Sequence, residues 1–151
     1  MKKTVVSHPR TVVAAALFTF AAPLSAFANE IYTTGGVAIN GYDAVAYFTD
    51  HKAVRGLAKF TTSYRGAIFH FASAAHRDAF MKNPQDYTPQ YGGYCAYGTA
   101  RGYKAPTEPQ AFTIVEDKLY LNYNDSVMTT WRADVTGYIG KADANWDTVK
   151  A

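Results

Sequence analysis

The sequence predicts an α+β fold, namely one small single domain built from two hairpin–helix (ββα) units with additional short helices. Aromatic and β-branched residues flank the pair Arg65-Gly66 and again the pair Glu116-Asp117, which is the pattern of two β-hairpins. Each hairpin is followed by a polar residue that can cap a helix and then by a helical segment. Both units therefore run strand, strand, cap, helix.

The first unit has expected strands at residues 60–64 and 67–72. Alternate residues of the second strand fall on two faces, which predicts a sheet packed on both sides: Ala67, Phe69 and Phe71 share one face, and Ile68 and His70 share the other. Ser73 is expected to cap a helix over residues 74–82, whose main core residue is Phe80.

The second unit has expected strands at residues 112–115 and 118–123, and Asn124 or Asp125 can cap the next helix. A further segment, residues 135–146, is helical in pattern. Residues of the two units recur at a constant shift of 51 positions: Ile68-Phe69, Phe80 and Tyr87 match Leu119-Tyr120, Trp131 and Tyr138. The recurrence fits either an internal duplication or a chance likeness of two ordinary ββα units.

Shorter elements are expected before each hairpin. Residues 29–40 are polar and Gly-rich, which predicts an extended N-terminal arm that leads into the domain. Asp43 is expected to cap one or two helical turns, because its carboxylate accepts bonds from unpaired N–H groups. Residues 92–98 predict a loop that enters a short buried helix and carries Cys95.

Residues 1–28 have the features of a cleaved signal peptide. Basic residues precede an apolar run over residues 12–22, which is too short to span a hydrocarbon core of ~30 Å. Ala26-Phe27-Ala28 then places small residues where signal peptidase reads, so cleavage is expected before Asn29. We expect a periplasmic protein, with an extracellular location as the alternative, and no stable membrane insertion after cleavage.

The composition argues against nucleic acid as a partner and indicates that aromatic residues supply the packing. The chain has 15 Lys and Arg and 12 Asp and Glu, and three of the basic residues lie in the expected signal peptide, so the rest carries no formal net charge. Nucleic acid is not an expected partner, because phosphate binding requires a basic surface. With one cysteine, no internal disulfide is possible, and 12 Tyr, nine Phe and two Trp must supply the packing.

Three stretches carry a resemblance to a known family: GYDAVAYF at 41–48, YRGAIFHFASAAHRDAFMKNPQDYTPQYGGYCAYG at 64–98, and FTIVEDKLYLNYN at 112–124. Together they resemble the YHS domain family, in particular its small exported single-domain members, and the domain is expected over residues 41–148. The resemblance implies a binding module associated with copper or other heavy-metal handling. It also implies a metal ion or a metal-transport protein as the partner.

The family resemblance also points to one junction in the chain. In metal-binding relatives the strand-to-helix junction reads Phe-Cys-Ser-x-x-Cys, and the matching stretch here is Phe71-Ala72-Ser73-Ala74-Ala75-His76. Both cysteines are absent. Ala72 offers no ligand atom, whereas His76 offers an imidazole where the relatives have a thiolate.

The candidate metal ligands are Cys95, His76 and His70. A strand-to-helix turn could bring the two imidazoles together, and the following loop could bring the thiol to them; such N and S donors suit Cu or Zn. The alternative is structural, with His70 as an ordinary strand histidine and His76 facing solvent.

Cys95 itself is open to two interpretations, because an unpaired thiol in an oxidising compartment is oxidised unless it is buried or used. It is either a small buried hydrophobe between Tyr94 and Tyr97, or a thiolate at a helix N-terminus that serves a metal or redox exchange. A thiol-dependent enzyme also needs a base and an orienting acid. No local motif ties such groups to Cys95, so no catalytic residue is assigned.

A cluster of tyrosines at positions 87, 91, 94, 97 and 103 is either the lining of a pocket for a flat ligand such as haem, or core and rim packing. The sequence thus leaves two main hypotheses for function. One is a metal-associated binding module, and the other is a structural or protein-interaction domain without metal.

Overall fold

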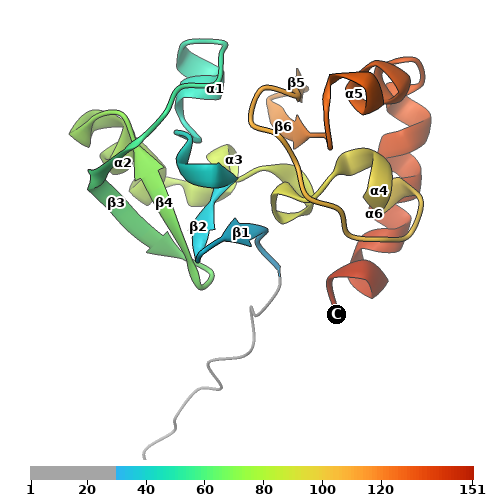
Figure 1. Ribbon diagram of the computed structural model, residues 1–151, viewed down its shortest axis with the longest axis horizontal. Helices are drawn as coiled ribbons and strands as arrows, with labels where there is room; N and C mark the ends of the chain where they lie inside the picture. Colours follow the sequence, from blue (N-terminus) through green and yellow to red (C-terminus); the bar gives the residue numbers. More distant parts are fainter. Residues whose placement is uncertain (1–29) are drawn as a thin grey trace, which may run out of the picture.

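The computed structural model of the chain describes residues 30–151, and the expected signal peptide with its cleavage site lies outside these residues. Two halves lie side by side, an N-terminal half drawn from blue to green and a C-terminal half drawn from olive to red (Figure 1). Helices and strands occur in both halves, which confirms the predicted α+β class.

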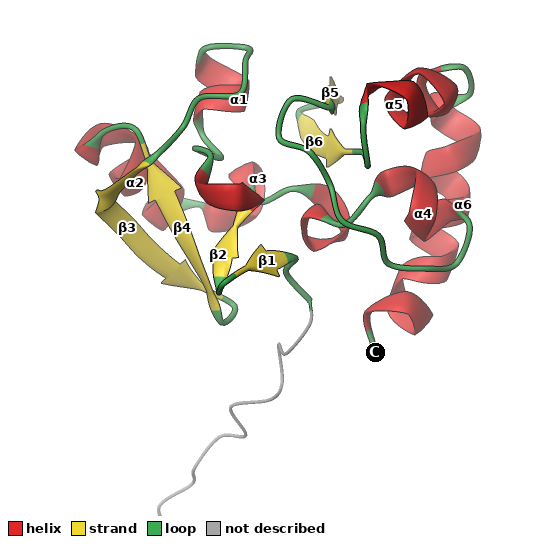
Figure 2. Cartoon of the chain, viewed as in Figure 1, coloured by secondary structure: helices red, strands yellow, loops and turns green. Residues whose placement is uncertain are grey.

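A four-stranded sheet forms the N-terminal half (Figure 2). Its strands are, in spatial order, β1 (Thr33–Thr34), β2 (Val37–Ala38), β4 (Ala67–Phe71) and β3 (Leu57–Tyr64). β3 and β4 are the predicted antiparallel hairpin, whereas β2 lies parallel to β4 with Val37 opposite Ile68. Arg65 and Gly66 both have positive φ, as a two-residue turn that follows strand twist requires.

The segment predicted as an extended arm is part of the fold. β1 and β2 form a hairpin around Gly35-Gly36, and the 3-10 turn η1 (Ile39–Gly41) follows it. Both glycines have positive φ, so the Gly-rich composition reflects a tight turn. Ile31 and Ala38 are buried, which ties the segment to the core.

The sheet is packed on one face, so the prediction of packing on both faces is wrong. Ala67, Phe69 and Phe71 are fully buried, whereas Ile68 on the opposite face is 42% exposed. The covering helix is α2 (Ala74–Lys82), and the ring centroid of its Phe80 lies 4.7 Å from that of Phe69. Two further short helices complete this half, α1 (Ala46–Thr49) and α3 (Pro84–Tyr87).

The C-terminal half is a two-stranded hairpin with three helices. Its elements are α4 (Ala96–Ala100), β5 (Phe112–Val115), β6 (Lys118–Leu121), α5 (Asp125–Arg132) and α6 (Val135–Lys150), and η2 (Gln90–Gly93) joins them to the first half. α6 is regular through Gly137 and Gly140, and its Ala142 and Trp146 pack on buried aromatic rings. The helix ends four residues later than expected.

The predicted recurrence at a shift of 51 is structural. Ser73 and Asn124 both cap a helix by accepting the backbone N–H three residues ahead, from His76 at 3.1 Å and from Val127 at 2.9 Å. The turns also match, since Glu116 and Asp117 have positive φ like Arg65 and Gly66. The two hairpin–helix units therefore share their caps and their turns, which agrees with an internal duplication and equally with two ordinary ββα units.

Two aromatic cores meet at β6. Leu119 and Leu121 belong to the core of the first half, and Tyr120 between them belongs to the core of the second half with Trp131. Alternate side chains of a strand point to opposite faces, so one strand can seal both cores. The two halves thus form a single domain.

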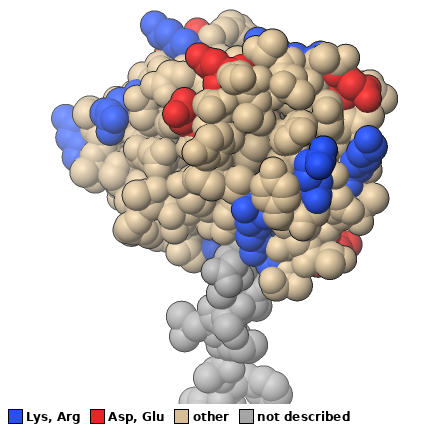
Figure 3. Space-filling view, turned by 45° about the vertical axis from the view of Figure 1, so that its right-hand side comes forward, with Lys and Arg blue, Asp and Glu red and all other residues tan. Residues whose placement is uncertain are grey.

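The surface shows no large region of one charge on the face drawn in Figure 3, where basic and acidic side chains lie in small separate groups. This distribution agrees with the balanced composition. Within residues 30–151, the helices are all too short or too polar to cross a membrane.

Candidate functional site

A buried carboxylate, that of Asp43, lies where α1, the end of β4 and the start of α2 meet. Its Oδ1 accepts the backbone N–H groups of Val45 at 2.8 Å and Ala46 at 3.2 Å. Its Oδ2 accepts the backbone N–H of Ala72 at 2.8 Å and lies 2.6 Å from Nδ1 of His76. Asp43 is completely buried, and these four contacts replace the water that the carboxylate loses on folding.

Local backbone geometry places both partners of this pair. The N–H of Asp43 donates to the carbonyl of Val54 at 2.8 Å, which fixes the residue at the entrance to α1. On the other side, the Ser73 cap starts α2 with a bond to the backbone N–H of His76. The imidazole therefore leaves the first turn of α2 directly beside the carboxylate.

The contacts of Asp43 determine which nitrogen of His76 carries the proton. Both carboxylate oxygens already accept backbone N–H groups, so the imidazole must donate from Nδ1. In the neutral ring Nε2 then keeps its lone pair. The His76 side chain is 23% exposed, and Nε2 faces the exposed hydroxyl of Thr49.

The outer nitrogen of the ring lies near a side-chain hydroxyl and, through it, a carboxylate. Nε2 lies 3.5 Å from Oγ1 of Thr49, and that hydroxyl lies 2.9 Å from Oδ1 of Asp50. Thr49 and Asp50 are exposed at the end of α1. The imidazole nitrogen and the carboxylate oxygen thus both contact the Thr49 hydroxyl, and donors of these two kinds suit Zn(II), Cu(II) or Ni(II) better than Cu(I).

Cys95 lies away from this surface, buried at the start of α4. Its sulfur accepts the N–H of Gly98 at 3.4 Å, and its S–H faces Oδ1 of Asn122 at 3.5 Å. Burial raises the pKa of the Cys95 thiol, although the backbone N–H groups of Gly98, Tyr123 and Tyr97 act in the opposite direction. The thiol therefore stays protonated and is inaccessible to a metal ion in solution.

Cys95 has a capping role in the second unit that resembles the role of Asp43 in the first, although it lies 52 and not 51 positions later. Asp43 accepts the N–H groups two and three residues ahead. Cys95 accepts the N–H of Gly98, three residues ahead, whereas the N–H of Tyr97 donates to Oδ1 of Asn122 at 3.1 Å. Asp43 also accepts the N–H of Ala72, and the N–H of Tyr123, 51 positions later, faces Cys95. The sulfur is thus a hydrogen-bonding cap of α4.

His70, the third candidate ligand, points to the exposed face of the sheet. It lines a shallow hollow of about 280 Å³ with Arg55, Asn40 and the backbone of Gly41 and Gly56. α2, which carries His76, covers the opposite face of the same sheet.

The structure therefore does not bring Cys95, His76 and His70 together. Within the described residues, no group of three or more His, Cys, Asp or Glu side chains is arranged to hold a metal ion. The donors present fit an open site of two donors at His76 and not a closed site of four protein ligands.

The tyrosine cluster is divided between separate contacts. Tyr87 packs on Phe48 and Phe80, whereas Tyr97 packs on Tyr138. Tyr103 is 51% exposed. These rings serve as core and rim packing and do not line one haem-sized pocket.

Comparison with known families agrees with the resemblance seen in the sequence. Residues 45–91 match the YHS domain family. The chain carries a YHS domain. The matched segment runs from α1 to η2 and includes His76, and YHS domains are associated with heavy-metal handling. No match was found among curated proteins or among solved structures.

Sequence reasoning found the Asp43 cap and the imidazole of His76 separately and missed their contact. They lie 33 positions apart, and each has a sufficient local explanation. No local pattern links the two residues, because Asp43 precedes α1 and His76 lies in the first turn of α2.

Replacing Asp43 by Asn tests the buried carboxylate. The amide has one acceptor oxygen, so N–H donors face its NH₂ group and lose their partners. We expect the free energy of unfolding to fall by about 3 kcal/mol, measured by urea denaturation. Asp50→Asn, on the exposed end of α1, is the matched control and should change it by less than about 0.5 kcal/mol. Equal effects of the two variants would contradict the account.

Cys95 is expected to react slowly with a disulfide reagent in the folded protein and rapidly in urea. The thiolate is the reacting form, and a raised pKa lowers its fraction, so the native rate should increase only above the usual thiol value of 9.0. The measurement is the rate of thiol labelling against pH. A fast native reaction at neutral pH that metal prevents would show that the thiol is an accessible ligand.

Proposed function

We propose that this protein is an exported metal-associated binding module that holds a divalent transition-metal ion loosely at His76. The observation that carries the proposal is the contact of 2.6 Å between Asp43 Oδ2 and His76 Nδ1 in a ring that is 23% exposed and whose Nε2 faces the exposed Thr49 hydroxyl. A metal-binding histidine commonly donates its other N–H to a carboxylate, which orients the ring and raises its basicity.

The second donor in this proposal is Asp50. Its carboxylate lies on the outer side of the imidazole, linked to it through the hydroxyl of Thr49. Two protein donors leave most coordination positions to water or to a partner protein. A site of this kind is suited to passing a metal ion on, which agrees with the association of YHS domains with heavy-metal handling.

Export supports the same function, because the sequence of residues 1–28 predicts a signal peptide. The partner in this proposal is a metal-transport protein or another metal carrier in the periplasm. The extracellular space is the alternative location.

A protein-interaction module without metal is the second candidate function. It is favoured by the uncovered face of the sheet, where Ile68 is 42% exposed beside Val37 of β2. The metal experiment separates the two functions.

The test is binding of Zn(II), Ni(II) and Cu(II) to the purified protein, measured by calorimetry on the wild type and two matched variants. His76→Asn keeps an N–H donor for Asp43 but lacks the outer nitrogen, so we expect affinity to fall about tenfold or more with the fold intact. His70→Asn changes a histidine on the other face of the sheet and should leave affinity unchanged.

Two results would overturn the metal proposal. One is the absence of binding by the wild type, which would leave the protein-interaction function. The other is unchanged affinity in His76→Asn together with loss of binding in His70→Asn or Cys95→Ser, which would move the site elsewhere.

A further inference from the structure

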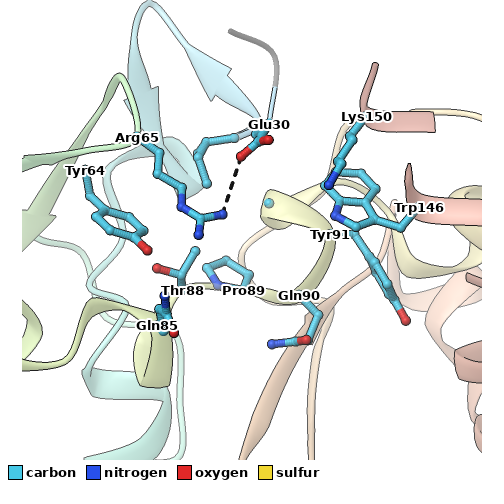
Figure 4. A pocket seen from close by; sticks show the side chains of 12 residues that line it. Glu30, Tyr64, Arg65, Gln85, Thr88, Pro89, Gln90, Tyr91, Trp146 and Lys150 are labelled. Atoms are coloured by element: carbon cyan, nitrogen blue, oxygen red, sulfur yellow. Dashed lines mark hydrogen bonds and ion pairs between the residues drawn. The ribbon is translucent and has the colours of Figure 1, made fainter. Parts of the chain in front are cut away.

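A second hollow, distinct from the His76 site, lies where the two halves and the N-terminal segment meet. It encloses about 190 Å³. The turn after β3 contributes Arg65, η2 contributes Gln90, and the last turns of α6 contribute Trp146 and Lys150 (Figure 4). Because three distant segments build it, the hollow exists only in the assembled domain.

Charged groups enter this hollow from opposite sides. Figure 4 shows Arg65 on one wall and Lys150 on the other, with Glu30 above them. Arg65 Nη1 lies 3.4 Å from Glu30 Oε2, which is a long contact for an ion pair. Lys150 Nζ lies 2.8 Å from Oδ1 of Asp147, outside the lining, so each cation of the hollow already has a carboxylate partner that a ligand carboxylate would have to replace.

Neutral groups complete the lining. The side chains of Gln85 and Gln90 both line the hollow. Trp146 forms an aromatic wall and packs edge-on against Tyr91, with 5.8 Å between the ring centroids. Charged, amide and aromatic groups therefore face one small space.

The backbone beneath the hollow is held in an uncommon conformation. Tyr91 has φ of 54°, in the left-handed region that a residue with a side chain seldom adopts. Gly92 follows with φ of 62°, and a Cβ there would meet the carbonyl oxygen of Glu30. Strain of this kind is found at ligand sites, where surrounding contacts maintain it.

From these observations we propose that this hollow binds a small organic carboxylate with a flat apolar portion. Its carboxylate lies between Arg65 and Lys150, and its apolar portion lies on Trp146. The guanidinium fork matches a carboxylate, and Glu30 already places one on Arg65. Glu30 is therefore an internal competitor that the ligand displaces.

The test uses benzoate as the probe, titrated into the purified protein without metal and followed by the indole N–H signal of Trp146 in NMR spectra. We expect saturable binding that weakens about tenfold in Arg65→Met and in Lys150→Met. Glu30→Gln removes the competitor and should tighten binding by about twofold to fivefold. Arg101→Met, an exposed cation of the α4 end, is the matched control and should have no effect.

Benzoate binding should tighten in Glu30→Gln and weaken in Arg65→Met, whereas damage to the fold would weaken binding in both variants. Absence of benzoate binding by both the wild type and Glu30→Gln would overturn the proposal. Binding of inorganic phosphate but not benzoate, with the same dependence on Arg65, would overturn the assignment to carboxylates. Because metal is absent, neither result depends on the function proposed for His76.

Discussion

The buried carboxylate of Asp43 is the constraint on which the arrangement of the first unit depends. Burying a charged group without partners is strongly unfavourable, so the four donors that face it must be present together. They come from the start of α1, from the residue after β4 and from α2. Formation of this cluster therefore couples three elements and fixes the direction of the His76 ring.

The second unit also caps the start of a helix with a buried side chain, but the capping atom is a sulfur and not a carboxylate oxygen. Cys95 caps the start of α4 as Asp43 caps the start of α1, and Val127 stands in the place of His76. A neutral sulfur can accept the backbone N–H of Gly98 without a charged partner, so no imidazole is needed there. The unpaired cysteine of the chain is thus explained by capping, and only the first unit presents a ring nitrogen to solvent.

Elements set by neighbouring residues could be predicted, and contacts between distant segments could not. The bounds of α2 and its Ser73 cap followed from local preferences, as did both hairpin turns. The pairing of Val37 with Ile68 and the contact of Asp43 with His76 join residues about 30 positions apart, and no local pattern encodes them. The hollow at Arg65 could not be predicted either, because segments that are distant in the sequence build it.

The position of the proton on the His76 ring tests the proposed function most directly, because metal binding there needs a proton on Nδ1 and a lone pair on Nε2. Long-range ¹H–¹⁵N NMR correlation at about pH 8 distinguishes the two nitrogens of a neutral imidazole. We expect an N–H signal from Nδ1 that is lost in Asp43→Asn, and an acceptor signal from Nε2. A proton on Nε2 and none on Nδ1 would contradict the account.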